Sequence, residues 1–198
     1  MGRTSLIGTC LALTFSLALP PQAVSQHLIE ARGADTEYRY LDWNYTWRNG
    51  PVVDLFYVGV PGSNEINLGG GYSFKRGHLM VAPLAYAVIG HEHSQRGVKL
   101  ALLVTFEDRG WKLLAFVGRY LPVSGGVDGY LVMDAFDLTR TIGTRWEAGV
   151  QSGFFRVDGA WNQQIGPLLK RNDGQGAWAV SYRFGTENEF RVGRVVVF

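Results

Sequence analysis

The stretch Arg191-Val-Gly-Arg-Val-Val-Val-Phe198 ends the chain and decides how the sequence before it is interpreted. Its valines are β-branched, and a β-branched run of this length favours an extended strand. A strand that finishes on an aromatic residue needs an apolar surface for that ring. We therefore expect residues 191–198 to form the last strand of a sheet that the upstream sequence must complete.

Segments upstream alternate between bulky apolar residues and small or polar ones. Between residues 177 and 185, one face carries Trp178, Val180, Tyr182 and Phe184, whereas the other carries alanine, serine, arginine and glycine. The same period of two recurs over residues 41–48, 66–75 and 146–154, and it is the period of a β-strand. A soluble sandwich normally has a charged outer face over a bulky aliphatic core. A glycine-rich polar face opposite an aromatic one instead favours a barrel with a narrow lumen.

Turn-forming residues recur at nearly even spacing along the chain and leave roughly a dozen short strands between them. We predict an all-β, antiparallel, up-and-down transmembrane barrel of about twelve strands, with residues 27–32 as the first. An even count is expected if both ends of the barrel lie on the same side of a membrane. Ten strands is the alternative, because Pro83 and Gly166-Pro167 interrupt two segments and proline cannot donate to a ladder.

The first 25 residues are typical of a secretory signal. Arg3 supplies a positive charge, residues 6–19 are mostly apolar, and Ala23-Val24-Ser25 is a small-residue cleavage site. The only cysteine, Cys10, lies in this segment. The mature chain, residues 26–198, is then a single domain without disulfides, thiol catalysis or cysteine metal sites.

Together these features resemble bacterial (Gram-negative) outer-membrane β-barrel proteins. The resemblance rests on the export signal, the alternating body, and Arg191, Gly193, Val196 and Phe198 in the terminal strand. In such proteins the barrel-assembly machinery reads the terminal strand. The resemblance implies location in the bacterial outer membrane, contact with outer-membrane lipid and that machinery as a partner. It does not single out a subfamily.

Charge is sparse and scattered, with a formal net charge of +2 over 198 residues. A nucleic-acid binder needs a basic stripe, so no nucleic-acid partner is expected. We expect Lys99, Arg145, Glu147 and Arg183 on lumen faces or strand ends, where they line the lumen, and we extend this expectation to a second set: Arg119, Asp134, Asp137 and Lys112. Such charges either plug a barrel as ion pairs or line a path for solutes. The leading interpretation is a small passive channel or structural barrel, with a small solute, no cofactor and no metal.

Aromatic residues near strand ends suit the girdles where a barrel meets the two membrane surfaces. They are Trp47, Trp111, Tyr120, Trp146, Trp161 and Trp178. Arg194 conflicts with this pattern, because strict alternation puts it on the same face as Val196 and Phe198, where an arginine facing lipid is costly unless it lies near an interface.

An enzyme is the alternative, although a non-enzymatic barrel is favoured. His93, Ser94 and Glu107 resemble in type the catalytic residues of outer-membrane lipid A deacylases, and they could make an acyl-transfer triad. In that family the serine follows two residues after the histidine, a place that Gln95 occupies here. His91 and His93 form a metal-binding pair only if other ligands join them. A third interpretation is a soluble periplasmic barrel that binds an apolar ligand.

Overall fold

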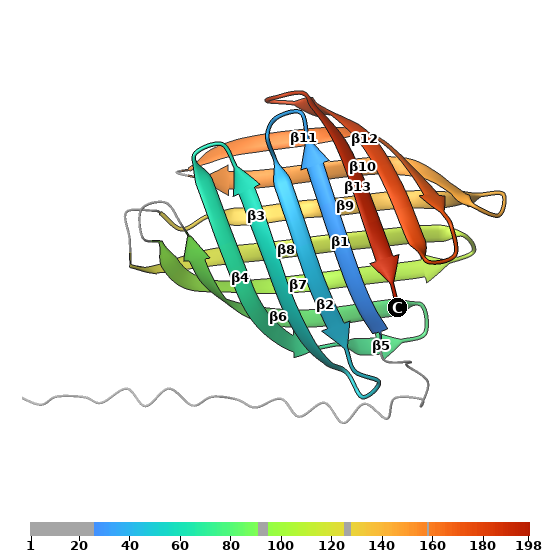
Figure 1. The fold of residues 1–198 in the computed structure, drawn as a ribbon, viewed down its shortest axis with the longest axis horizontal. Coiled ribbons are helices and arrows are strands. Elements are labelled where there is room, and N and C mark those ends of the chain that lie inside the picture. The colour runs from blue at the N-terminus through green and yellow to red at the C-terminus, as the bar shows by residue number, and fades with distance from the viewer. Residues whose placement is uncertain (1–25, 91–94, 125–127, 158) are drawn as a thin grey trace, which may run out of the picture.

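The computed structural model describes residues 26–90, 95–124, 128–157 and 159–198, so the expected signal segment lies outside the described residues. The described chain is all-β (Figure 1). Its strands are β1 Gln26–Ala34, β2 Arg39–Thr46, β3 Pro51–Val60, β4 Ser63–Tyr72, β5 Phe74–Arg76, β6 Leu79–Gly90, β7 Arg96–Asp108, β8 Trp111–Ser124, β9 Leu131–Ile142, β10 Trp146–Val157, β11 Ala160–Asn172, β12 Gly176–Gly185 and β13 Glu189–Val197. Among the described residues, no helix is long and apolar enough to cross a membrane.

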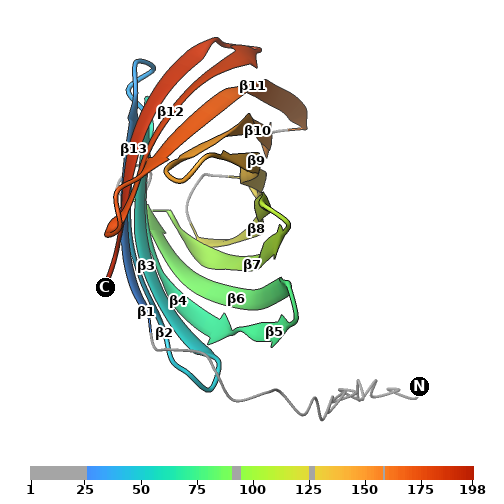
Figure 2. The same ribbon diagram turned by 90° about the vertical axis from the view of Figure 1, so that its right-hand side faces the viewer.

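The strands close into one antiparallel barrel, whose curved wall is seen in Figure 2. Apart from β4 and β5, strands that follow one another along the chain are paired, and β1 pairs with β13 from Leu28↔Val197 to Ala34↔Arg191, which closes the wall. β4 and β5 both pair with β6 in the same register, so they occupy one position in the wall. The described chain therefore forms a closed barrel of twelve strands, which confirms the predicted fold class and the larger of the two counts.

Both doubtful segments are full strands, and their prolines lie where the ladder is interrupted. Pro83 lies at the junction of β4 and β5, since Leu84 pairs with Gly71 and Val81 pairs with Phe74. Pro167 pairs with β10, whereas its pairing with β12 is interrupted. A proline has no N–H to donate, so each one loses ladder bonds locally without ending its strand.

The outer face of the barrel is apolar, as the alternation predicts. Side chains such as Leu68, Trp178 and Phe184 are more than half exposed, and exposed Leu, Val, Ile and aromatic residues occur on strands around the wall. An exposed apolar surface of this extent is unusual for a soluble monomer. It is the surface that a barrel presents to lipid.

The last strand lies at the seam of the barrel. Arg191 and Gly193 face inward, and Phe198 is 71% exposed, with its N–H donating to His27 O at 3.0 Å. We call the end of the barrel that holds Gln26 and Phe198 the terminal rim, and the opposite end the far rim. Recognition of this strand by the assembly machinery stays a prediction.

Candidate functional site

The candidate site is the lumen, a cavity of about 2910 Å³. Its lining includes Trp47 and His78 at the terminal rim, and Thr36, Pro61 and Glu187 at the far rim. A single cavity therefore extends through the barrel from one rim to the other.

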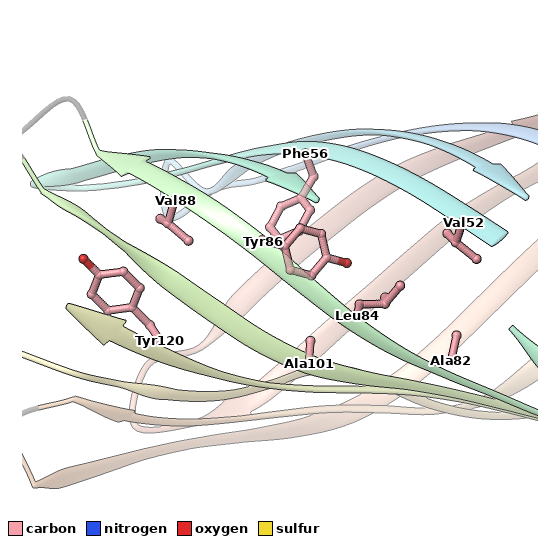
Figure 3. Close-up of a cluster of buried hydrophobic side chains, with 8 residues drawn as sticks. All are labelled: Val52, Phe56, Ala82, Leu84, Tyr86, Val88, Ala101 and Tyr120. Carbon is pink, nitrogen blue, oxygen red and sulfur yellow. The ribbon is translucent and has the colours of Figure 1, made fainter. Parts of the chain in front are cut away.

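An aromatic wall covers the side of the lumen formed by β2, β3, β6 and β8. It consists of Tyr40, Phe56, Tyr86, Phe116, Tyr120 and Tyr130. Phe56 packs edge-on against Tyr86 with ring centroids 5.1 Å apart, and Tyr120 stacks on Tyr130 at 4.9 Å. Figure 3 shows Phe56 and Tyr86 together with the smaller buried residues around them. Such ring pairs add stability beyond the area they bury, so we expect this side of the lumen to be rigid.

Tyr120 corrects one expectation from the sequence. It was expected in an interfacial girdle, but its side chain is fully buried in the lumen. The strand positions Gly118 and Tyr120 face inward, whereas Arg119 faces outward and is exposed. Position near a strand end thus does not reveal which face an aromatic residue occupies.

Lys99 lies at the edge of the aromatic wall. Its Nζ contacts Glu65 Oε1 and lies 5.2 Å from the ring centroids of both Phe56 and Tyr130. Tyr130 also donates its hydroxyl to Glu65. The Lys99 ammonium is thus held by one carboxylate and two ring faces.

Two further carboxylates bind lysines on the β8 to β12 side. Glu147 Oε1 accepts from Lys112 Nζ at 2.7 Å and from Asn172 at 2.8 Å. Asp137 accepts from Lys170 Nζ at 2.9 Å. These pairs join residues that are more than thirty positions apart in the sequence, so they tie different hairpins together.

Glu189 binds two arginines at once. Its Oε1 contacts Arg183 and Arg191, and its Oε2 accepts from Thr36 Oγ1 at 2.8 Å. The side chains of all three charged residues are at most 5% exposed. The Arg191 guanidinium also lies 4.0 Å from the ring centroid of Tyr38. This cluster links β12 and β13 to the turn between β1 and β2.

Asp42 and Asp54 are different, because neither makes an ion pair with a cation in the described part of the chain. Both line the cavity. Tyr86 donates its hydroxyl to Asp54 Oδ2 at 2.6 Å. Among the described residues, no group of three or more His, Cys, Asp or Glu is arranged to hold a metal ion.

Three of the four residues expected in the lumen lie on its inner face. Lys99, Glu147 and Arg183 are all buried and paired as described above. Arg145 is different: it lies exposed in the turn between β9 and β10, and its carbonyl accepts from Asn172 N at 2.7 Å. The turn shifts it out of the alternating pattern of β10, which begins only at Trp146.

The secondary set also divides. Asp137 and Lys112 face inward, and Arg119 faces outward. The side chain of Asp134 lies outside the described residues. Sequence reasoning missed the carboxylates that pair with the expected cations, among them Glu65 and Glu189. Their inward parity on β4 and β13 was a readable signal, but no sequence feature indicates which of them meets which cation.

The residues considered for an acyl-transfer triad are not brought together by the described structure. His93 and Ser94, like His91 of the alternative metal pair, lie outside the described residues. Glu107 lies at the terminal-rim end of β7, with its side chain 69% exposed and Lys112 Nζ 3.7 Å away. β6 ends at Gly90 and β7 begins at Arg96, both at the far rim, whereas Glu107 lies at the other end of β7.

Comparison with solved structures gives a consistent result. The structure is similar to the KdgM porin, with a TM-score of 0.64 and 14% identity over 87% of this chain and 99% of that chain. It has the fold of these porins. A KdgM porin structure in complex with disordered oligogalacturonate matches with the same TM-score at 13% identity. The NanC porin matches with a TM-score of 0.62 and 10% identity, over 86% of this chain and 98% of that chain.

No protein-family model and no curated protein sequence matches the chain. At these low identities the likeness establishes the porin fold alone, and it does not favour the hydrolase alternative.

Proposed function

We propose that this chain is a bacterial outer-membrane channel that passes small polar solutes and ions. The observation that carries the proposal is the cavity of about 2910 Å³, whose lining reaches both rims of a barrel with an apolar outer face. A barrel plugged by its own side chains would lack a cavity of that extent. Outer-membrane lipid surrounds the barrel, and the assembly machinery inserts it through β13.

The lumen suits weak rather than strong charge selection. Five lining cations contact a carboxylate: Arg32, Lys99, Lys112, Lys170 and Arg191. Arg48 and Lys75 also line the cavity, at the terminal rim. Paired charges present dipoles to a passing ion instead of a net field. The aromatic wall opposite offers flat apolar faces, so polar solutes with an apolar side can pass along it.

One of the KdgM porin structures is a complex with oligogalacturonate, which is an acidic oligosaccharide. For this chain, acidic oligosaccharides are therefore one solute class to test. Neutral oligosaccharides are the natural comparison, because the residues that line the cavity include more carboxylates than lysines and arginines.

The test is single-channel conductance of the refolded protein in a planar bilayer, beside a variant with Lys99→Glu and Arg183→Glu. Discrete steps whose cation preference increases in the variant support an open lumen lined by these residues. A wild-type barrel that inserts, shows heat-modifiable migration and yet conducts no ions would overturn the channel. Added oligosaccharides then report solute class through transient blocking of the steps.

A further inference from the structure

Arginines and tryptophans alternate on the outer face next to the terminal rim. We call this set the arginine–tryptophan belt: Trp111, Arg140, Trp146, Arg171, Trp178 and Arg194. The guanidinium carbons lie 5.5, 5.6 and 5.2 Å from the ring centroids in the pairs Arg140–Trp111, Arg171–Trp146 and Arg194–Trp178. Arg156 stacks on Trp161 in the same way beside the far rim, as the one arginine–tryptophan pair there among the described residues.

The belt follows neighbouring strands, with an offset of two residues between β9 and β10, where Arg140 pairs with Ala148 and Trp146 with Ile142. The three stacked pairs are cross-strand partners in the hairpins β8–β9, β10–β11 and β12–β13. Arg171 is also the cross-strand partner of Trp178, which connects the second hairpin to the third. Side chains that are cross-strand partners lie beside each other on one face of the wall. The belt therefore forms a row of neighbouring side chains near the terminal-rim ends of six consecutive strands.

The belt lies at the edge of the apolar outer face that is nearest the terminal rim. One step toward the middle of the barrel, the same strands expose Leu138, Leu169, Val180 and Val192. Beyond the belt lie the turns of the terminal rim. Tryptophans at such a boundary settle where a membrane changes from hydrocarbon to headgroups. The belt arginines are thus at headgroup depth, which also accounts for Arg194 on the outer face.

Two of the arginines carry charge that the protein does not neutralise. Arg140 and Arg171 are exposed and have no carboxylate within 4.0 Å in the part of the chain that the structure describes. Arg194 instead pairs with Asp173 at 2.9 Å. Slight desolvation raises the pKa of Asp173, but hydrogen bonds from Gln175 N and Arg194 outweigh it and hold that pKa below its usual value.

A guanidinium stacked on an indole face keeps its N–H edge available. Stacking uses the flat face of the group, whereas its donors point outward in its plane. Those donors match two oxygens of a phosphate, which binds arginine more specifically than a lysine ammonium. Tryptophan fixes the plane in advance, so less side-chain entropy is lost when an anion binds.

We propose that Arg140 and Arg171, held by Trp111 and Trp146, bind the headgroup phosphates of anionic phospholipids at the terminal rim. This inference rests on the proposed membrane location but is independent of whether the lumen conducts. It gives the belt a ligand, in addition to its position at headgroup depth in the membrane. The barrel then selects lipids on the side of the β8 to β13 strands.

The test is native mass spectrometry of the protein released from vesicles that hold equal amounts of phosphatidylcholine and phosphatidylglycerol. Wild type should retain phosphatidylglycerol preferentially. Each arginine near an anionic surface contributes about 1 kcal/mol, or about fivefold in affinity. The double variant Arg140→Gln and Arg171→Gln should therefore lose roughly thirtyfold of that preference.

A matched double variant controls for net charge. Arg39→Gln and Arg119→Gln remove two exposed, outward-facing arginines away from the belt and should retain phosphatidylglycerol as wild type does. Equal losses in both double variants, or no loss in the belt variant, would overturn the proposal. If the belt variant does not fold, the double variant Arg140→Lys and Arg171→Lys keeps the charge. It should still lose part of the preference for phosphatidylglycerol, because an ammonium lacks the planar guanidinium group that stacks on tryptophan. Heat-modifiable migration and conductance, measured on each variant, separate failure of the lipid-binding proposal from failure of the channel proposal.

Discussion

Replacing Glu189 by glutamine removes the charge that holds two arginines together while leaving the size of the side chain nearly unchanged. Arg183 and Arg191 both contact this carboxylate, and Thr36 donates to its other oxygen. A glutamine amide oxygen still accepts hydrogen bonds, but the lumen gains one net positive charge. We therefore expect the channel to shift toward anions.

The size of the shift follows from Coulomb's law. An ion passing about 5 Å from the lost charge in water changes its energy by about 0.8 kcal/mol. The energies of a passing cation and a passing anion shift in opposite directions. The difference between them therefore changes by about 1.7 kcal/mol before screening. Salt reduces this effect, which leaves a fall in the cation-to-anion ratio of roughly fivefold to tenfold. Weakening hydrogen bonds to charged partners should also cost about 1–3 kcal/mol of unfolding free energy.

The assay is the reversal potential of the Glu189→Gln barrel in a planar bilayer with a salt gradient. Glu37→Gln is the matched control, since Glu37 is exposed in the β1–β2 turn and does not line the cavity. Its reversal potential should equal that of wild type. A Glu189→Gln barrel that folds and conducts with an unchanged reversal potential would show that ions do not pass this cluster, and the electrostatic reasoning would be refuted.

Two further outcomes are expected. Gly166→Ala should lower the unfolding free energy by about 1–3 kcal/mol, because a Cβ at this position would lie 1.8 Å from Tyr182 O on β12; an unchanged midpoint of urea unfolding in vesicles would contradict this. The lipid A of cells that express the protein, or its His93→Ala variant, should give the same mass spectrum as that of cells without it, and loss of an acyl chain that depends on His93 would revive the hydrolase alternative.

The fold was predictable from the sequence because it depends on local periodicity. Alternation such as that of Trp178, Val180 and Phe184 is set by the pleat of a single strand, and these residues face outward as expected. Pro83 and Pro167 were harder to interpret, since a proline costs ladder bonds on one side of a strand only. The partner on the other side maintains the strand.

The lumen was less predictable because it depends on register between distant strands. Lys99 could be placed inside from parity alone, but its partner Glu65 is 34 positions away. Arg145 was misplaced for a different reason: a turn just before β10 ends the alternation on which its assignment relied. The aromatic wall was also missed, since inward and outward aromatic residues look the same when each strand is considered alone.

The pairing of charges at the seam between β1 and β13 has a consequence for how the barrel is opened or assembled. On one edge, Arg32 contacts Glu30 of the same strand. On the other edge, Glu189 holds Arg183 and Arg191 within its own hairpin. Separating the two edges therefore breaks backbone hydrogen bonds without pulling these opposite charges apart. Each edge can enter a membrane with these ion pairs already formed. Closing the cylinder then adds the β1–β13 backbone ladder, the Thr36–Glu189 hydrogen bond and the contact of Arg191 with Tyr38.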